Sequence, residues 1–230
     1  MKDEDIERIK ATIVDWKYMK ELPESIRGFR LRYLRTRNED VYNLYTYINE
    51  PLHRSATVYY HAETREYKVR FQIGSFEFCD EEFISSSLEE FEQLLQEHFE
   101  ELLQQLTEFQ PGQMDAMLKA THVLEWDYSS MLPDTLNGFE LFIRPSQPFR
   151  ITNGSYVIFD YEHFATRSNF AVYYNIYRDE FFGDLRVDGV PDVNYEFDSH
   201  TLEELQEKLS VHLVPRLQAI LEAAKRSTDP

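Results

Sequence analysis

A segment that occurs twice places the strongest constraint on how this chain folds. Its copies are residues 16–31 and 126–141. Trp, Tyr, Leu, Pro, Gly, Phe and Leu recur in them at identical spacing, with a constant offset of 110, and unrelated segments of this length almost never agree so closely. The sequence therefore predicts a tandem duplication.

The similarity continues beyond this segment at an offset of 114, so the second copy contains four extra residues. We place them near residues 145–148 and 153–154, where two prolines and an Asn-Gly pair are typical of a loop. The residues that match at the larger offset are Val58, Tyr59 and Tyr60 with Val172, Tyr173 and Tyr174, Glu82 and Phe83 with Glu196 and Phe197, and Leu95, His98 and Leu103 with Leu209, His212 and Leu217.

We expect two repeat units, residues 1–110 and 111–230, related by a pseudo-twofold axis. Each is predicted to be an α+β unit in which a helix is followed by an antiparallel sheet of four or five strands and then by a closing helix. The first helices are expected at residues 4–14, with Val14 on the apolar stripe, and at 113–123, after the Pro111-Gly112 boundary.

Runs rich in Tyr, Phe, Val and Ile predict the strands, and apolar residues at three- and four-residue steps predict the closing helices. Ser87 with Glu90, and Thr201 with Glu204, match the capping box that opens a helix. The expected strands are residues 28–37, 41–48, 55–61, 66–73 and 76–78 in the first unit, and 138–144, 155–161, 168–177, 180–187 and 193–197 in the second.

Trp16 and Trp126 stand just before a Leu-Pro turn that leads into the first strand of each unit. Aromatic residues at such junctions usually pack in the core, and a ligand-stacking role is the alternative. We expect both tryptophans to fill the junction between helix and sheet.

The formal net charge is −18, and each half of the chain carries −9. A uniformly acidic protein repels the nucleic-acid backbone and anionic membranes, so neither is expected as a partner. No apolar run approaches the roughly 18 residues that a spanning helix needs. The start of the chain has no apolar signal-peptide core, and the single cysteine, Cys79, forms no intramolecular disulfide, so we expect a cytoplasmic protein.

Adjacent tyrosines in two strands point to opposite faces of the sheet. One residue of each pair, for which we take Tyr59 and Tyr173 as candidates, is therefore expected on the face away from the closing helix. That face could be covered by the other unit, by a second copy of the chain in a homodimer, or by a partner.

The closing helix of the first unit has a nearly unbroken row of outward acids. Glu97, Glu100 and Glu101 are its candidate partner-binding residues, because concentrated charge attracts an oppositely charged protein; plain solubility also explains acidity. The second closing helix places Val211, Pro215 and Arg216 further along, so the two outer surfaces are not equivalent.

The sequence contains no phosphate-binding loop, nucleophile elbow or metal-binding His or Cys motif, and we predict no catalytic residue, no cofactor and no metal. The acids at positions 184, 188, 192, 196 and 198 lack the spacing of a calcium-binding loop. These features favour a non-enzymatic interaction module, an adaptor, chaperone-like or toxin-neutralising protein, that binds a basic protein or peptide. The alternative is a small-molecule-binding protein or enzyme with a pocket between sheet and helix or between the units.

Overall fold

The computed structural model describes the backbone of residues 2–228 and the side chains of residues 4–226. The chain divides into two compact units, Met1–Glu108 and Phe109–Pro230, and each is described here by itself. The sequence analysis placed the boundary at residues 110 and 111. Each unit mixes helices with one antiparallel sheet, so the α+β class is confirmed.

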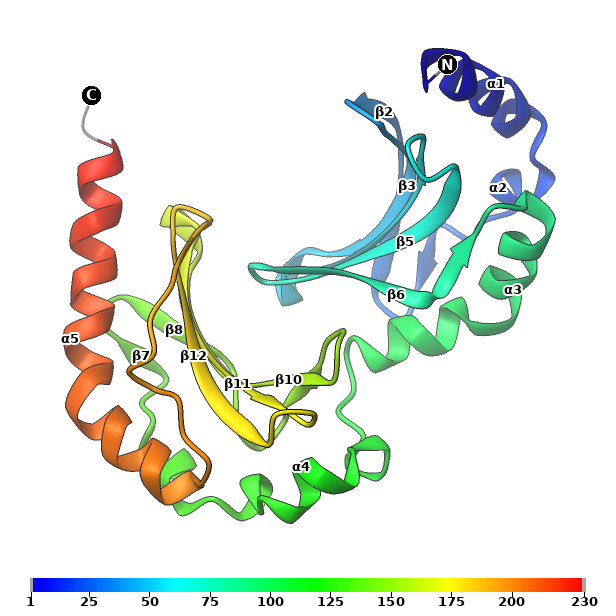
Figure 1. The fold of residues 1–230 in the computed structure, drawn as a ribbon. Coiled ribbons are helices and arrows are strands. Elements are labelled where there is room, and N and C mark those ends of the chain that lie inside the picture. The colour runs from blue at the N-terminus through cyan, green and yellow to red at the C-terminus, as the bar shows by residue number, and fades with distance from the viewer. Residues whose placement is uncertain (1, 229–230) are drawn as a thin grey trace. The chain divides into compact units, whose positions relative to one another are not determined.

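The first unit is built around a six-stranded antiparallel meander in the order β1-β2-β3-β4-β5-β6 (Figure 1). Two helices precede the sheet and the closing helix α3 follows it. The elements are α1 (Lys2–Asp15), α2 (Lys17–Lys20), β1 (Ser25–Ile26), β2 (Phe29–Asn38), β3 (Val41–Asn49), η1 (Glu50–Leu52), β4 (Arg54–His61), β5 (Glu66–Ile73), β6 (Phe76–Ser85) and α3 (Leu88–Gln105).

The second unit contains a seven-stranded sheet in the order β13-β12-β11-β10-β8-β7, with β9 also paired to β10. The elements are η2 (Pro111–Gln113), α4 (Ala116–Ala120), η3 (Val123–Glu125), η4 (Asp127–Met131), β7 (Thr135–Leu136), β8 (Phe139–Ile143), β9 (Phe149–Arg150), β10 (Ser155–His163), η5 (Phe164–Thr166), β11 (Ser168–Asn175), β12 (Glu180–Val187), β13 (Val190–Asp192) and α5 (Leu202–Thr228). Figure 1 shows the closing helix α5 running along one face of this sheet.

The expected count of four or five strands per sheet was wrong. Short strands β1 and β7 pair with the next strand through two-residue hairpins. Strand β6 continues to Ser85, beyond the predicted end at residue 78, because Ile84 pairs with Lys68 after the register shifts opposite β5. The acidic residues 80–82 lie in the stretch where the register shifts.

Two predictions in the second unit were also wrong. The helix expected at residues 113–123 is reduced to α4, which Asp115 caps and which ends before His122, whose φ of 58° is left-handed. The strand expected at residues 193–197 is a loop, because the side chain of Asn194 accepts a hydrogen bond from the amide of Glu196 and turns the chain. The short strand β13 precedes this loop.

Each closing helix packs an apolar stripe on one face of its sheet, as the periodicity predicted. In the first unit the ring of Phe91 stacks on Tyr67 with centroids 5.6 Å apart, and Phe99 lies 5.6 Å from Tyr47. Val14 of α1, expected on an apolar stripe, is exposed instead. The buried residues of α3 are Phe91, Leu95, Phe99, Leu102 and Leu103.

The junction before each sheet is the same in both units. Trp16 and Trp126 are 5% and 7% exposed, which confirms their packing role. Each lies 5.3 Å from its neighbouring tyrosine, and Trp16 also donates a hydrogen bond from Nε1 to Glu92, at 2.6 Å. Left-handed φ angles of 83° and 87° at Gly28 and Gly138 complete the hairpins that follow.

The strand pairings of the two units also correspond. The β3–β4 register shifts between Asn43 and Tyr45, and the β10–β11 register shifts between Val157 and Phe159, which are the same positions at an offset of 114. Strand β2 has a further shift between Tyr33 and Thr36. Such a bulge bends a strand and increases its twist.

Candidate functional site

Each sheet has a face turned away from its closing helix, called the far face below. Tyr60 packs toward Tyr67 on the helix side, whereas Tyr59 contacts Cys79 and Arg70 on the far face, as alternation predicted. Tyr59 and Tyr173 are only 7% and 6% exposed. The far faces therefore do not present these two tyrosines to solvent.

On the far face of the first unit, Tyr59 lies among Cys79, Arg70 and Asn43. The phenol of Tyr59 lies 3.1 Å from Cys79 Sγ, and the guanidinium of Arg70 lies 5.4 Å from the centre of the Tyr59 ring. Arg70 also donates a hydrogen bond to Asn43, at 3.3 Å. Burial, followed by the contact with Cys79, raises the pKa of Tyr59, so its phenol stays neutral.

The far face of the second unit contains two fully buried acids, Asp160 and Glu162. Asn169 donates a hydrogen bond to Asp160 Oδ1 at 2.9 Å. Burial raises the pKa of Asp160 well above its usual range, and the neighbouring charge of Glu162 raises it further. The sequence analysis missed this pair, although acids two residues apart within an otherwise apolar and aromatic strand were a visible signal.

A shallow pocket of about 180 Å³ lies beside β12 in the second unit. Strand β13 pairs with the outer edge of β12, and the loop of residues 193–198 that follows it moves away from this edge. The chain pairs with β12 again only at the Phe181–Ser199 bridge, and the pocket lies between these two points. Gly183 permits this path, since a Cβ at this position would lie 2.8 Å from the ring of Phe197. The lining residues are Arg178, Phe182, Gly183, Asp184, Val193, Asn194, Tyr195 and Asp198.

The pocket combines aromatic rings with partly buried acids. Phe182 is stacked on Tyr173, with centroids 5.0 Å apart and planes 5° apart. Burial raises the pKa of Asp184, against the lowering effect of Arg186. Burial and the charge of Glu180 raise the pKa of Asp198.

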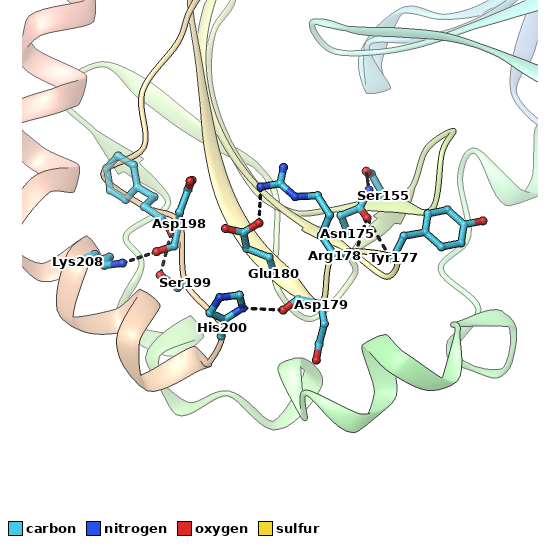
Figure 2. A network of polar contacts seen from close by, with 11 residues as sticks. Ser155, Asn175, Tyr177, Arg178, Asp179, Glu180, Asp198, Ser199, His200 and Lys208 are labelled. Carbon is cyan, nitrogen blue, oxygen red and sulfur yellow. Dashed lines mark hydrogen bonds and ion pairs between the residues drawn. The ribbon is translucent and has the colours of Figure 1, made fainter.

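Figure 2 shows a network of polar contacts that includes two pocket-lining residues, Arg178 and Asp198. The side chain of Asn175 accepts from the amides of Tyr177 and Arg178 and donates to Ser155, which closes the turn between β11 and β12. Arg178 forms an ion pair with Glu180. In the same network, His200 Nδ1 lies 3.0 Å from the carbonyl of Asp179, and the amine of Lys208 donates to the carbonyl of Asp198.

Several exposed apolar side chains belong to the pocket lining or to the chain segments next to it. Val193 and Tyr195 are 76% and 78% exposed although they line it, and Val190 and Tyr177 on adjoining segments are also largely exposed. Large apolar side chains grouped at a polar-rimmed recess are a common mark of a protein-binding surface. The sequence analysis assigned residues 193–197 to a strand and so missed this site.

The three candidate acids of α3 stand in solvent on the first unit. Glu97 and Glu100 have side chains 69% and 65% exposed, and Glu101 is exposed. Glu100 forms an ion pair with Arg27 at 3.0 Å, and Glu97 lies 3.6 Å from His98. The helix contains no lysine or arginine to offset its six glutamates.

Within the side chains described, no group of three or more His, Cys, Asp or Glu residues has the geometry to hold a metal ion. Of the helices described, none combines the length and the apolar composition that crossing a bilayer requires. The comparisons with known proteins do not assign a family: no family model, curated protein or solved structure matches this chain.

Proposed function

We propose that this chain is a non-enzymatic interaction module that binds a basic protein or peptide through the outward face of α3. The observation that carries the proposal is the concentration of exposed acid on a helix that contains no lysine or arginine, with Glu100 paired to Arg27 from outside the helix. Glu97, Glu100 and Glu101 are neighbours at three- and four-residue steps, and the rest of the helix provides no basic residue.

This charge placement lowers the stability of the helix. Like charges at three- and four-residue steps destabilise a helix by about 0.2–0.5 kcal/mol per pair, and negative charge is unfavourable toward the C-terminal end. Solubility alone would be served by acids at any exposed position. An electrostatic surface that speeds the encounter with a basic partner accounts for their concentration on one helix face.

The alternative of a small-molecule site is less well supported. The pocket beside β12 has a volume of about 180 Å³, below the roughly 300–1,000 Å³ typical of small-molecule sites. The buried acids Asp160 and Glu162 are closed to solvent and so to a substrate.

We further propose that the two units arose by duplication of one ancestral unit. The constant sequence offsets support this proposal, as do the matching Trp–Tyr contacts, the matching hairpins at Gly28 and Gly138, and the register shifts at equivalent positions of β3 and β10. A common origin would explain why the same junction is specified twice.

The proposed binding is tested by affinity capture from native cell extract at low and high salt, with the wild-type chain and a Glu97→Lys, Glu100→Lys, Glu101→Lys variant as baits. Exposed charges more than about 10 Å apart are screened at ~0.1 M salt, so the captured partner should bind less at high salt. Stopped-flow mixing with that partner should show a slower association rate for the variant, by about tenfold or more.

A matched control reverses three exposed glutamates elsewhere, Glu21, Glu24 and Glu125, and thereby changes the net charge by the same amount. This variant should keep most of the association rate if the α3 face is the docking surface. If both variants lose the same fraction of the association rate, the effect comes from the net charge of the protein and not from the α3 face. The proposal is wrong if the association rate of the partner changes neither with salt nor with the α3 reversal.

A further inference from the structure

The pocket beside β12 has a chemistry that the acidic face of α3 lacks. It is a recess with aromatic walls and partly buried carboxylates, whereas Glu97 and Glu100 of α3 have mostly exposed side chains. We propose that this pocket receives an arginine side chain from an extended segment of the basic partner. The proposal rests on the function above and adds a second, specific contact to it.

The pocket contains a carboxylate to which no cationic side chain of the described residues is directly bonded. Arg178 is paired with Glu180, Arg186 approaches Asp184 at 3.5 Å, and the Lys208 side chain is engaged by Glu204 and the main chain. Among the residues described, no hydrogen bond or ion pair reaches the Asp198 carboxylate. The charges of Arg178 and Lys208 act on Asp198 without bonding its carboxylate, and a guanidinium in the pocket would supply the direct hydrogen bonds.

The aromatic lining of the pocket suits a flat cationic group. Guanidinium is planar, is weakly hydrated and stacks on aromatic rings, and the pocket is lined by the rings of Phe182 and Tyr195. Tyr173 and Arg178 already lie against the Phe182 ring, at 5.0 Å and 5.7 Å from its centre, so the exposed ring of Tyr195 is the surface offered to a partner guanidinium. Lysine offers one compact charge and would use the aromatic walls less well.

Main-chain and side-chain N–H groups beside the pocket form no hydrogen bonds within the described chain. Phe181 and Leu185 direct their main-chain groups to the outer edge of β12, and Gly183 faces the same edge, because alternate residues of a strand do so. The structure gives Gly183 no main-chain partner there among the described residues. The Nδ2 atom of Asn194 is likewise buried with no hydrogen-bond partner in the described chain.

These groups fit an extended segment whose main chain lies near Gly183 and whose arginine enters the pocket. Neighbouring apolar side chains of the segment would rest on the exposed Val193 and Tyr195. Main-chain hydrogen bonds to the edge of β12 would accept any extended segment, whereas the charged pocket would select a segment that carries an arginine.

The test is an NMR titration of the full ¹⁵N-labelled chain with a short blocked peptide, acetyl-Thr-Val-Arg-Val-Thr-amide. Its matched control carries citrulline, the neutral analogue of arginine, at the central position. The arginine peptide should shift the amide signals of Gly183, Asn194 and Asp198, and the citrulline peptide should bind about tenfold more weakly, because hydrogen bonds to charged groups are the stronger ones.

The Asp184→Asn, Asp198→Asn double variant should reduce binding of the arginine peptide to the level of the citrulline peptide. The exposed Glu125→Gln change is the control and should leave binding intact, with thermal unfolding confirming that each variant is folded. Equal binding of the two peptides, or full binding by the double variant, would overturn the pocket.

The α3 triple reversal separates this inference from the proposed function. It should slow association of the captured partner while leaving the peptide shifts at Gly183 in place. If the arginine peptide fails to bind while partner capture still depends on α3, the pocket is wrong and the module stands. If the peptide binds and α3 reversal has no effect on capture, the α3 surface is wrong.

Discussion

Asp160 occupies a strand position where a charged carboxylate is unfavourable. It is fully buried beside Glu162, and Asn169 donates a hydrogen bond to its Oδ1 atom at 2.9 Å. Burial and the second acid both raise its pKa. The folded protein therefore keeps a proton on Asp160 at a pH where the unfolded chain, with a carboxyl pKa of about 3.9, has lost it.

This difference predicts how stability changes with pH. Because the folded pKa is raised, the stabilisation is fully present below the unfolded pKa and is lost as pH rises through the folded pKa, at up to about 1.4 kcal/mol per pH unit. Asp160→Asn, which stays neutral, should therefore gain in unfolding temperature over wild type as pH increases from about 4. The exposed Glu125→Gln change, outside the sheet, is the control and should show no such trend, and a pH-independent difference for Asp160→Asn would contradict the assignment.

Trp16 and Trp126 give a second prediction at the residue scale. Truncating a buried Trp to Ala costs about 3–5 kcal/mol, so Trp16→Ala and Trp126→Ala should each lower the free energy of unfolding by that order in chemical denaturation. The exposed Tyr177→Ala is the matched control and should change it by less than about 0.5 kcal/mol. Retained stability with lost partner binding would instead make the tryptophans ligand contacts.

At the scale of elements, alternation and helical periodicity located most strands and both closing helices. Strands β3, β4 and β5 lie within a residue or so of their expected ends because their apolar faces are buried and regular. The second half of β6 was missed because its pairing with β5 depends on a register shift, which the side-chain pattern does not encode. Residues 193–197 alternate like a strand, but Asn194 turns them into a loop.

The long helix α5 carries a testable irregularity, Pro215 in its interior. Proline has no N–H to donate to the carbonyl of Val211 and is less favourable than alanine in a helix by up to about 3 kcal/mol. Pro215→Ala should therefore raise the unfolding temperature, with the exposed Gln218→Ala as a control for helix propensity alone. A lower unfolding temperature would show that the proline fits a bend on which the packing depends.

At the scale of the whole molecule, each unit has its own sheet and its own apolar core. Fragments 1–108 and 109–230 should therefore each fold when produced separately, with cooperative thermal unfolding followed by circular dichroism. A fragment of residues 1–86, which lacks α3, should not fold cooperatively, since the apolar face of its sheet would be uncovered. Unfolded single units would contradict the division.

The candidate site was only half accessible from sequence. Exposed acids on a periodic helix, such as Glu97 and Glu100, can be placed from the helical pattern alone. The pocket could not be, because Phe182 and Asp198 come together only through the path of a loop that sequence pattern assigned to a strand. The burial of Asp160 could not be predicted without knowing which face of its strand is covered.

Strand β2 has a consequence for how molecules of this protein behave in concentrated solution. Strand β1 pairs only with its first residues, Phe29 and Arg30, so in the described chain the remaining outer edge has no strand beside it. Such an edge can recruit an identical edge from another molecule and begin aggregation. Here the exposed Arg32, Arg35 and Arg37 would face their own copies, and the bulge at Arg35 twists the strand out of register. In a chain of net charge −18, resistance to aggregation at this edge thus depends on positive charge.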